Sequence, residues 1–455
     1  MSETGFIKRL IRSVVRPNGQ ARADRKARNA VSLCQALLSE RGEVSGAALA
    51  QEALSAYREL PAAGLATFFD LLVSEFSPDP QQLIAAFEAY RADPSPDHLI
   101  HLQRQVEPPR QELFRRLNMA PGGMTALVAM RRHVLEGLRS HPDWKVIDAD
   151  FAHLFGSWFN RGFLTLQRID WRTPAIVLEK LIQYEAVHEI TGWKDLHRRL
   201  EADRRCFALF HPALLEDPLI FIEVALTRGI STSVQPLLDV SSPVANPAHA
   251  DSAVFYSITN CQEGLRGISF GNLLIKQVMQ ELQREYPRLS HFATLSPIPG
   301  FSAWLKSVEE RLAGAANGPA LLGELRRLQD ADWFRLGGAA ERLRPLLMQL
   351  CAYYLLVARQ EGLPVDPVAR FHLGNGARLE RLNWLADTSE QGMRRSAGLM
   401  VNYVYHLSEV ENNHEAFVHE HRVVASYELK KLARKCPLAQ RAARPEKKRV
   451  ESSIQ

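Results

Sequence analysis

A serine followed by two closely spaced prolines stands at the end of the apolar run Phe292–Leu295. Proline has no amide hydrogen and a fixed φ, so Pro297 and Pro299 should end strand pairing and hold Ser296 extended at the rim of a sheet. A hydroxyl held in this way suits a site residue. An ordinary strand-ending Ser-Pro turn is the commoner meaning of such a stretch on its own, so the preceding segment has to decide between the two.

The segment before Ser296 has the pattern strand, turn, helix, strand. Val254–Ile258 is β-branched and aromatic, and Leu273–Tyr286 carries apolar residues at the spacing of an amphipathic helix. Between them, Arg266–Asn272 forms a turn whose two glycines permit close backbone approach. Free N–H groups and the positive end of a helix dipole would meet there, which suits a phosphate or pyrophosphate. Alone, a loose glycine turn is a weak signal.

Longer motifs in this region resemble two known groups of proteins. The turn Arg266-Gly267-Ile268-Ser269-Phe270-Gly271 is similar to the pyrophosphate loop of the GNAT acyltransferase fold, with Ser269 in place of its first glycine. Several motifs in the same order resemble the malonyl-CoA decarboxylase family: Phe255–Ile258, Gln262–Gly267, Leu274–Lys276, Glu281–Glu285, Leu295–Phe301 and Phe371–Ala377. The resemblance runs from about Trp158 to about Tyr405 and is specific because the motifs are long and ordered.

The resemblance implies that the chain converts malonyl-CoA to acetyl-CoA and carbon dioxide. Such a site must stabilise charge that develops on the thioester oxygen and deliver a proton to carbon. The thioester is itself the electron sink, so we expect neither a metal nor an organic cofactor. A lone histidine on an apolar face is more often a satisfied core residue, but the resemblance makes His372 the proton donor and Ser296 its proton-accepting partner.

The resemblance also assigns the pyrophosphate of coenzyme A to the turn. Its residues are Arg266, Gly267, Ile268, Ser269, Phe270, Gly271 and Asn272. Ser257 and Asn375 are candidates for the acyl pocket, and each fits a turn or strand-end role equally well. Tyr403-Val404-Tyr405 is interpreted as core and dimer packing rather than chemistry, and His211 as structural.

Two other function classes remain open at this stage. A GNAT-type acyl-CoA-dependent N-acyltransferase is compatible with the fold but leaves the motifs around Ser296 and His372 unexplained. A catalytically silent acyl-CoA-binding regulator would keep the turn and need neither motif. Fold alone cannot separate these classes, because function belongs to the site.

Composition limits the setting. The 455 residues, 46% of them hydrophobic, allow two sizeable cores, and a net charge of +5 is mild for this length. Basic residues gather at both ends without a nucleic-acid motif, so we expect no nucleic-acid partner. Five widely spaced cysteines predict no disulfide framework or zinc site and favour a reducing, cytoplasmic setting. No apolar run reaches the length that spans a membrane.

The periodicity changes along the chain. Helical patterns broken by Ser77–Pro80 and Asp93–Pro96 fill the first part, and strand patterns begin only with Cys206–Phe210. We therefore predict an α+β protein: an N-terminal all-helical bundle over residues 1–165 and a GNAT-like mixed-sheet catalytic domain over residues 166–455. The resemblance suggests a homo-oligomer, a tetramer, formed through the bundle. The stripe Phe6–Val15 resembles a transit peptide, but we favour a docking helix.

Overall fold

The computed structural model describes residues 3–39, 43–214, 216–268, 274–315, 317–330, 332–335 and 338–439, and side chains within these ranges from residue 19 onward except at 43 and 44. The chain divides into two compact units. The first holds Met1–Thr165 together with the short segments Phe210–Pro218 and Gln262–Phe270. The second holds Leu166–Leu209, Leu219–Cys261 and Gly271–Gln455. Helices alone precede a mixed sheet with helices, which confirms the predicted α+β class.

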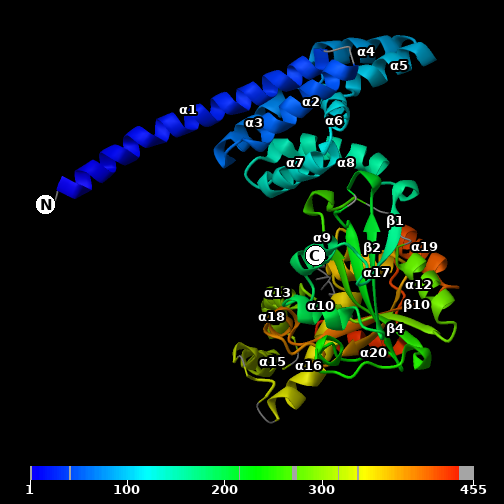
Figure 1. Ribbon diagram of the computed structural model, residues 1–455. Helices are drawn as coiled ribbons and strands as arrows, with labels where there is room; N and C mark the ends of the chain where they lie inside the picture. The colour runs from blue at the N-terminus through cyan, green and yellow to red at the C-terminus, as the bar shows by residue number, and fades with distance from the viewer. Residues whose placement is uncertain are drawn as a thin grey trace, which may run out of the picture. The chain divides into compact units, whose positions relative to one another are not determined.

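The first unit is helical up to residue 158 apart from one short 3₁₀ turn (Figure 1). Its helices are α1 Glu3–Ser39, α2 Glu43–Arg58, α3 Ala62–Glu75, α4 Pro80–Ala92, α5 Pro96–Val106, α6 Pro109–Leu117, α7 Gly123–Gly137 and α8 Lys145–Trp158. The predicted breaks cap two of them: the side chains of Asp79 and Ser95 accept from the first-turn amides of α4 and α5, each with proline at its first position. The predicted docking helix Phe6–Val15 is part of α1.

Aromatic side chains fill the core of this unit. Phe114 of α6 and Phe151 of α8 stack with ring centroids 4.1 Å apart. Beside them the buried guanidinium of Arg110 lies 2.8 Å from Asp150. A buried charge is tolerated only when paired in this way, so the pair fixes how α6 and α8 pack.

The second unit is built on one sheet in the order β1-β2-β3-β4-β5-β10-β6, with β9 also paired to β10 (Figure 1). The strands are β1 Thr165–Ile169, β2 Arg204–Phe210, β3 Ile220–Thr227, β4 Ser252–Asn260, β5 His291–Thr294, β6 Ser296–Pro297, β9 Arg378–Asn383 and β10 Met400–Tyr405. The hairpin β7 Arg359–Gln360 and β8 Leu363–Pro364 lies apart from it. Pairing is antiparallel along β2-β3-β4 and around β10, and parallel between β4 and β5.

The second unit also contains helices, which lie between its strands in the sequence and after the last one. They are α9 Ala175–Tyr184, α10 Trp193–Arg199, α11 Gln235–Leu238, α12 Leu274–Glu285, α13 Phe301–Ser307, α14 Glu309–Ala313, α15 Gly318–Leu325, α16 Ala339–Leu356, α17 Pro367–Gly374, α18 Glu390–Ser396, α19 Val410–Glu420 and α20 Tyr427–Lys435. The predicted helix Leu273–Tyr286 is confirmed as α12. α16 is largely buried, as its apolar composition predicts.

The sheet parts beside β4. Parallel pairing of β4 with β5 ends at Phe255 and Thr294, with one further bond from the Leu295 amide to the Phe255 carbonyl at 2.8 Å. The next strand, β6, pairs with β10 instead. The far half of β4, from Ser257 on, therefore has a hydrogen-bonded strand only on its β3 side.

One sequence expectation about this region is wrong. Pairing does not stop at Ser296, because Ser296 lies opposite Val401 and Pro297 opposite Met400 in the β6–β10 ladder. β6 is the last strand of the sheet, and proline is tolerated on an edge strand whose amide side faces away from the ladder. Ser296 is thus held by strand pairing as well as by its prolines.

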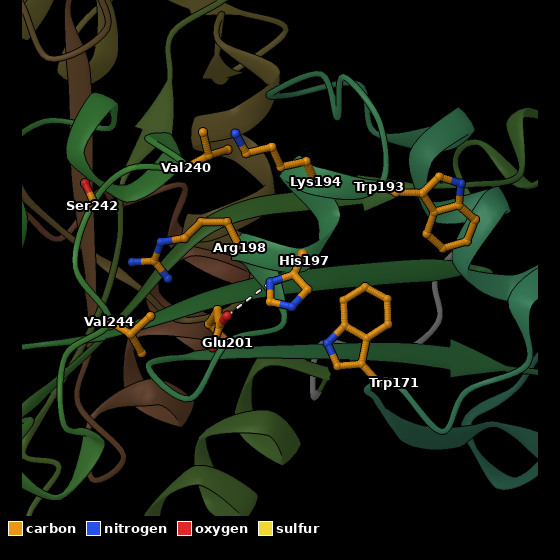
Figure 2. A pocket seen from close by; sticks show the side chains of 9 residues that line it. All are labelled: Trp171, Trp193, Lys194, His197, Arg198, Glu201, Val240, Ser242 and Val244. Carbon is orange, nitrogen blue, oxygen red and sulfur yellow. Dashed lines mark ion pairs between the residues drawn. The ribbon is translucent and has the colours of Figure 1, made fainter.

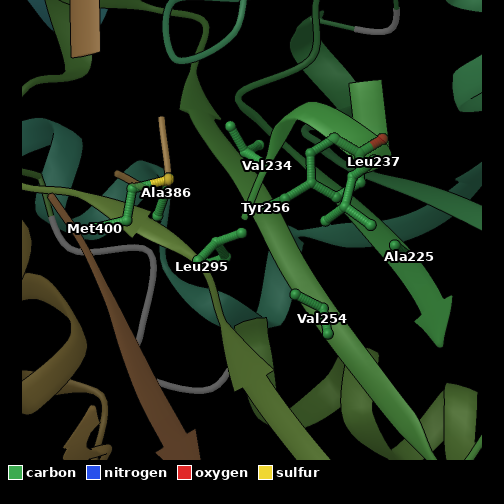
Figure 3. Packing of buried hydrophobic residues seen from close by; sticks show 8 residues of the cluster. All are labelled: Ala225, Val234, Leu237, Val254, Tyr256, Leu295, Ala386 and Met400. Atoms are coloured by element: carbon green, nitrogen blue, oxygen red, sulfur yellow. The ribbon is translucent and has the colours of Figure 1, made fainter. Parts of the chain in front are cut away.

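A buried apolar cluster covers one side of this region (Figure 3). Its members come from β3, β4, β10, α11 and the segments between elements: Ala225, Val234, Leu237, Val254, Tyr256, Leu295, Ala386 and Met400. Because Leu295 is fully buried here, the residue after it has a fixed position and direction.

Three further observations concern the described part of the chain. None of its helices has the length and apolar character needed to cross a membrane. The five cysteines, Cys34, Cys206, Cys261, Cys351 and Cys436, are free thiols, and all are buried. No group of three or more His, Cys, Asp or Glu side chains is placed to hold a metal ion among these residues.

Candidate active site

A small cavity of about 240 Å³ lies in the second unit where β4 and β6 separate. β4, β6, α17 and the turn after α9 supply its walls. The lining residues are Val187, Phe255, Tyr256, Ser257, Ile258, Asn260, Ser296, Pro297, Pro367, Val368, Phe371 and His372. The cavity therefore holds two serines and one histidine among mostly apolar side chains.

Ser296 and His372 are in direct contact at this cavity. The Oγ of Ser296 lies 3.0 Å from Nε2 of His372, and it donates to Oγ1 of Thr294 at 2.8 Å. A hydroxyl has one proton, so the contact with His372 needs the ring proton on Nε2. Nδ1 is then the acceptor of the Tyr405 hydroxyl, 2.8 Å away. The geometry gives a chain of donors from Tyr405 through His372 and Ser296 to Thr294.

Local sequence explains why His372 points where it does. α17 begins at Pro367 because the side chain of Asp366 accepts from the Ala369 amide at 2.8 Å. His372 then falls in the last turn of α17, and its ring stacks on Tyr403 with centroids 4.6 Å apart. The helix itself therefore brings the imidazole to the cavity.

Burial decides the protonation states. His372 is 3% exposed, and loss of hydration lowers its pKa to about 3, so the ring is neutral near pH 7. Burial raises the pKa of Tyr405 well above 10, so its phenol keeps its proton. A neutral imidazole that accepts at Nδ1 and donates at Nε2 agrees with the hydrogen-bond pattern.

The second serine of the cavity has a different partner. Ser257 of β4 donates to the buried carboxylate of Glu185, with both oxygens 2.8 Å from Oγ. Glu185 also accepts from the amides of Val187 and His188 at 2.8 and 2.7 Å and from the hydroxyl of Thr259 at 3.1 Å. The carboxylate therefore ties the turn after α9 to β4.

Asn375, the other predicted pocket residue, lies at the C-terminal end of α17. Its side-chain amide donates to the carbonyl oxygen of Phe371 at 2.8 Å, and its backbone caps the helix. It is absent from the lining of the cavity as described. A place for Asn375 in the acyl pocket stays a prediction.

The predicted pyrophosphate turn is described only as far as Ile268, and Ser269, Phe270, Gly271 and Asn272 lie outside the described residues. Within the first unit, Arg131 of α7 donates to the carbonyl oxygens of Gly264 and Arg266 at 2.8 and 2.9 Å. Gly267 has φ +80°, a conformation that favours glycine, and a Cβ added there would meet nothing within 4 Å. The hydrogen bonds from Arg131 thus hold the backbone at the start of the turn in place, and the space beside Gly267 is open.

Another hollow, of about 440 Å³, lies on α10 and also contains an imidazole beside a carboxylate (Figure 2). There Nδ1 of His197 lies 3.0 Å from Glu201, one helical turn further along the chain. The His197 side chain is 61% exposed, and no hydrogen bond joins it to a serine in the part of the chain that the structure describes. Such a solvated pair on a helix surface contributes little, so this hollow is a poor candidate for chemistry.

Two family models match the chain. Residues 76–159 match the malonyl-CoA decarboxylase N-terminal domain, and residues 162–446 match the malonyl-CoA decarboxylase C-terminal domain. The chain belongs to the malonyl-CoA decarboxylase family. Together the two matches cover most of both units.

Members of the malonyl-CoA decarboxylase family with known structures agree along almost their whole length. The crystal structure of malonyl-CoA decarboxylase from Rhodopseudomonas palustris is 50% identical, has a TM-score of 0.85, and aligns over 89% of this chain and 99% of that chain. The one from Agrobacterium vitis is 51% identical with a TM-score of 0.84 over the same shares. Mitochondrial malonyl-CoA decarboxylase from Anser anser anser is 37% identical over 71% of this chain and 69% of that protein.

Three residues of the site were missed or misread in the sequence. Thr294 precedes Ser296 by two positions and was counted only as strand. Tyr405 was assigned to packing, although period-two alternation places it on the same face of β10 as Tyr403, which stacks on His372. Glu185 was given no role. A contact between segments far apart in the chain gave no local signal in each case.

Proposed function

We propose that this chain decarboxylates malonyl-CoA to acetyl-CoA and carbon dioxide, with His372 and Ser296 as the reacting pair. The contact of 3.0 Å between Ser296 Oγ and His372 Nε2, inside a small and mostly apolar cavity, carries the proposal. Membership of the malonyl-CoA decarboxylase family supports it.

The chemistry needs one carbon–carbon bond to break and one proton to be delivered. The bond between the methylene and carboxylate carbons breaks, and its electron pair forms the enolate of the thioester as carbon dioxide leaves. Nε2 of His372 then gives its proton to the methylene carbon. Each turnover consumes one proton. Water supplies this proton, which restores the one that Nε2 of His372 has given up. Tyr405 keeps Nδ1 an acceptor, so the transferable proton stays on the nitrogen that lines the cavity.

Ser296 has the complementary task of holding the malonyl carboxylate. Its hydroxyl donates to Thr294 in this structure and lies 3.0 Å from His372, and we propose that it turns from Thr294 to the malonyl carboxylate when the substrate binds. Transfer of a carboxylate into a mostly apolar cavity costs hydration, whereas carbon dioxide carries no charge. The negative charge passes from the carboxylate to the enolate of the thioester as the bond breaks, so the cavity disfavours the localised charge of the reactant relative to the delocalised charge of the transition state, which lowers the barrier to decarboxylation.

Coenzyme A binding is the second part of the proposal. We assign its pyrophosphate to Arg266–Asn272, because this glycine-bearing turn leads directly into α12, whose N-terminus supplies free amides and a favourable dipole. We further propose that the helical first unit supports assembly into a homotetramer and that the protein acts in the cytoplasm, with no metal or organic cofactor and no nucleic-acid or membrane partner.

The decisive experiment is incubation of the purified full chain with malonyl-CoA, with and without an amine acceptor. Carbon dioxide and acetyl-CoA should form in equal amounts without the amine. Formation of an amide only in its presence would replace the proposal with the acyltransferase alternative. Tight binding of malonyl-CoA without any product would replace it with the regulator.

A further inference from the structure

Val187 lies between two cavities of the second unit. It lines the small cavity that holds Ser296 and His372, and it also lines a larger cleft of about 1090 Å³. The cleft extends over α10, α11 and the start of α18 and is lined mostly by charged and polar side chains, with Val187, Pro236 and Leu238 as its apolar residues. No other residue appears in the lining of both spaces as described. Val187 is therefore the residue that the two linings share.

The position of Val187 is fixed from two directions. Its backbone amide donates to Glu185 at 2.8 Å, and the same carboxylate is tied to Ser257 and Thr259 of β4. A valine has restricted χ1 freedom, because both methyl groups branch at Cβ. The isopropyl group is half-buried and has little freedom to turn aside. It therefore acts as a rigid partition.

The sizes of the two spaces give this partition a consequence. A volume of about 240 Å³ is below the range of about 300–1,000 Å³ that is usual for drug-sized ligands, so the small cavity suits a short acyl group. The cleft has room for a chain of several carbons. Resting on the proposed function, we infer that Val187 determines how large a substituent malonyl-CoA can carry at its methylene carbon. Removal of its two methyl groups should join the cavities.

The test compares Val187→Ala with Val368→Ala. Val368 is also a half-buried valine on the wall of the small cavity, but it does not line the cleft. Both variants remove the same volume, and only the first opens the partition. kcat/KM is measured for malonyl-CoA, 2-methylmalonyl-CoA and 2-butylmalonyl-CoA. Val187→Ala should raise the butylmalonyl-to-malonyl ratio by about 10-fold or more, the usual effect of a few methylene contacts, and Val368→Ala should leave this ratio near that of wild type.

A third variant, Val187→Leu, extends the partition and should lower the methylmalonyl-to-malonyl ratio. It also keeps the test decisive if Val187→Ala fails to fold by circular dichroism. Equal ratios for Val187→Ala and Val368→Ala, or a methylmalonyl ratio unmoved by Val187→Leu, would overturn the inference. A wild-type protein that does not decarboxylate malonyl-CoA at all would instead overturn the proposed function, so the two failures are distinct.

Discussion

Two serines face the same cavity from neighbouring parts of the sheet, and their surroundings differ in one respect. Ser296 on β6 and Ser257 on β4 are both buried, and each has a threonine two positions away that shares its hydrogen bonds. The partner of Ser296 is the neutral imidazole of His372, whereas the partner of Ser257 is the carboxylate of Glu185. The two serines therefore differ in the side chain that each hydroxyl contacts.

That partner determines what each hydroxyl can do. An imidazole accepts at one nitrogen and donates at the other, so the pair with Ser296 can hold and move a proton. A carboxylate only accepts, and Glu185 already receives bonds from two backbone amides and two hydroxyls. The proton of Ser257 is committed to this network. We therefore expect Ser296 to take part in the reaction and Ser257 to stabilise the fold.

The largest effect should follow from removing either member of the first pair. Ser296→Ala and His372→Asn should each lower kcat for malonyl-CoA by a factor of about 10² to 10⁴, the usual contribution of a positioned acid or base. Each group acts on the reacting carbons rather than on the large coenzyme, so KM should change little. Steady-state assays of carbon dioxide release measure both constants.

The double variant sharpens this result. Because the two residues act as a unit, the combined loss should be smaller than the product of the single losses. Near-normal decarboxylation by His372→Asn would show that another group or water supplies the proton, and would leave His372 a structural residue.

The next largest effect concerns the residue behind the imidazole. Tyr405→Phe removes the hydrogen bond to Nδ1 of His372 and should lower kcat by about 2- to 10-fold, since one such bond contributes about 0.5–1.5 kcal/mol. Tyr403→Phe is a matched control, because Tyr403 also contacts the ring but its hydroxyl has no hydrogen-bond partner among the described residues. This control should keep its rate. Equal losses in the two variants would show that ring packing, and not the hydrogen bond to Nδ1, supports His372.

Sequence patterns predicted the parts of this site that depend on local chemistry. The helix α12 and the helical breaks before α4 and α5 follow from backbone rules that hold within a few residues. The strand change from β5 to β6 did not follow, because it depends on β10, more than a hundred residues further along the chain. A pairing strand so far along the chain gives no sequence signal near Ser296.

The same limit explains the residues around the histidine. His372 and Ser296 came from the family resemblance, and nothing local to either indicates that they meet. Tyr405 and Glu185 gained their roles only when β10 and the turn after α9 were placed beside α17 and β4. Tyr405 lies in a sequence that is typical of a buried strand, so packing was the natural interpretation. Glu185 lies in a turn whose sequence gives no local signal of a role.

A smaller effect on rate, with a visible effect on stability, should follow from changes at the second serine. Ser257→Ala should lower kcat by less than about fivefold and destabilise the fold by about 1 kcal/mol through one lost hydrogen bond. Glu185→Gln should cost more, about 1–3 kcal/mol, because its amide group would face hydroxyl and backbone donors with a donor of its own. Denaturant unfolding measures these values. A loss of rate in Ser257→Ala as large as that of Ser296→Ala would erase the distinction between the serines.

The smallest effect should be the contribution of His372 to the pH dependence of stability. Burial lowers the pKa of His372 to about 3, whereas an unfolded histidine titrates near 6.5. Between these values the unfolded chain takes up a proton that the folded chain excludes, so stability should fall as pH drops below about 6.5 and level off below about 3. From pH 6 to 5 this residue should account for a loss of about 1 kcal/mol in the free energy of unfolding.

His188, whose pKa burial lowers to about 4, adds a similar slope that remains in every variant. His372→Asn should therefore be less acid-sensitive than wild type in urea unfolding at the two pH values, and Ser257→Ala should keep the wild-type slope. An unchanged slope in His372→Asn would mean that the folded protein protonates this imidazole as readily as the unfolded chain does, and the neutral donor on which the proposed proton transfer depends would be lost.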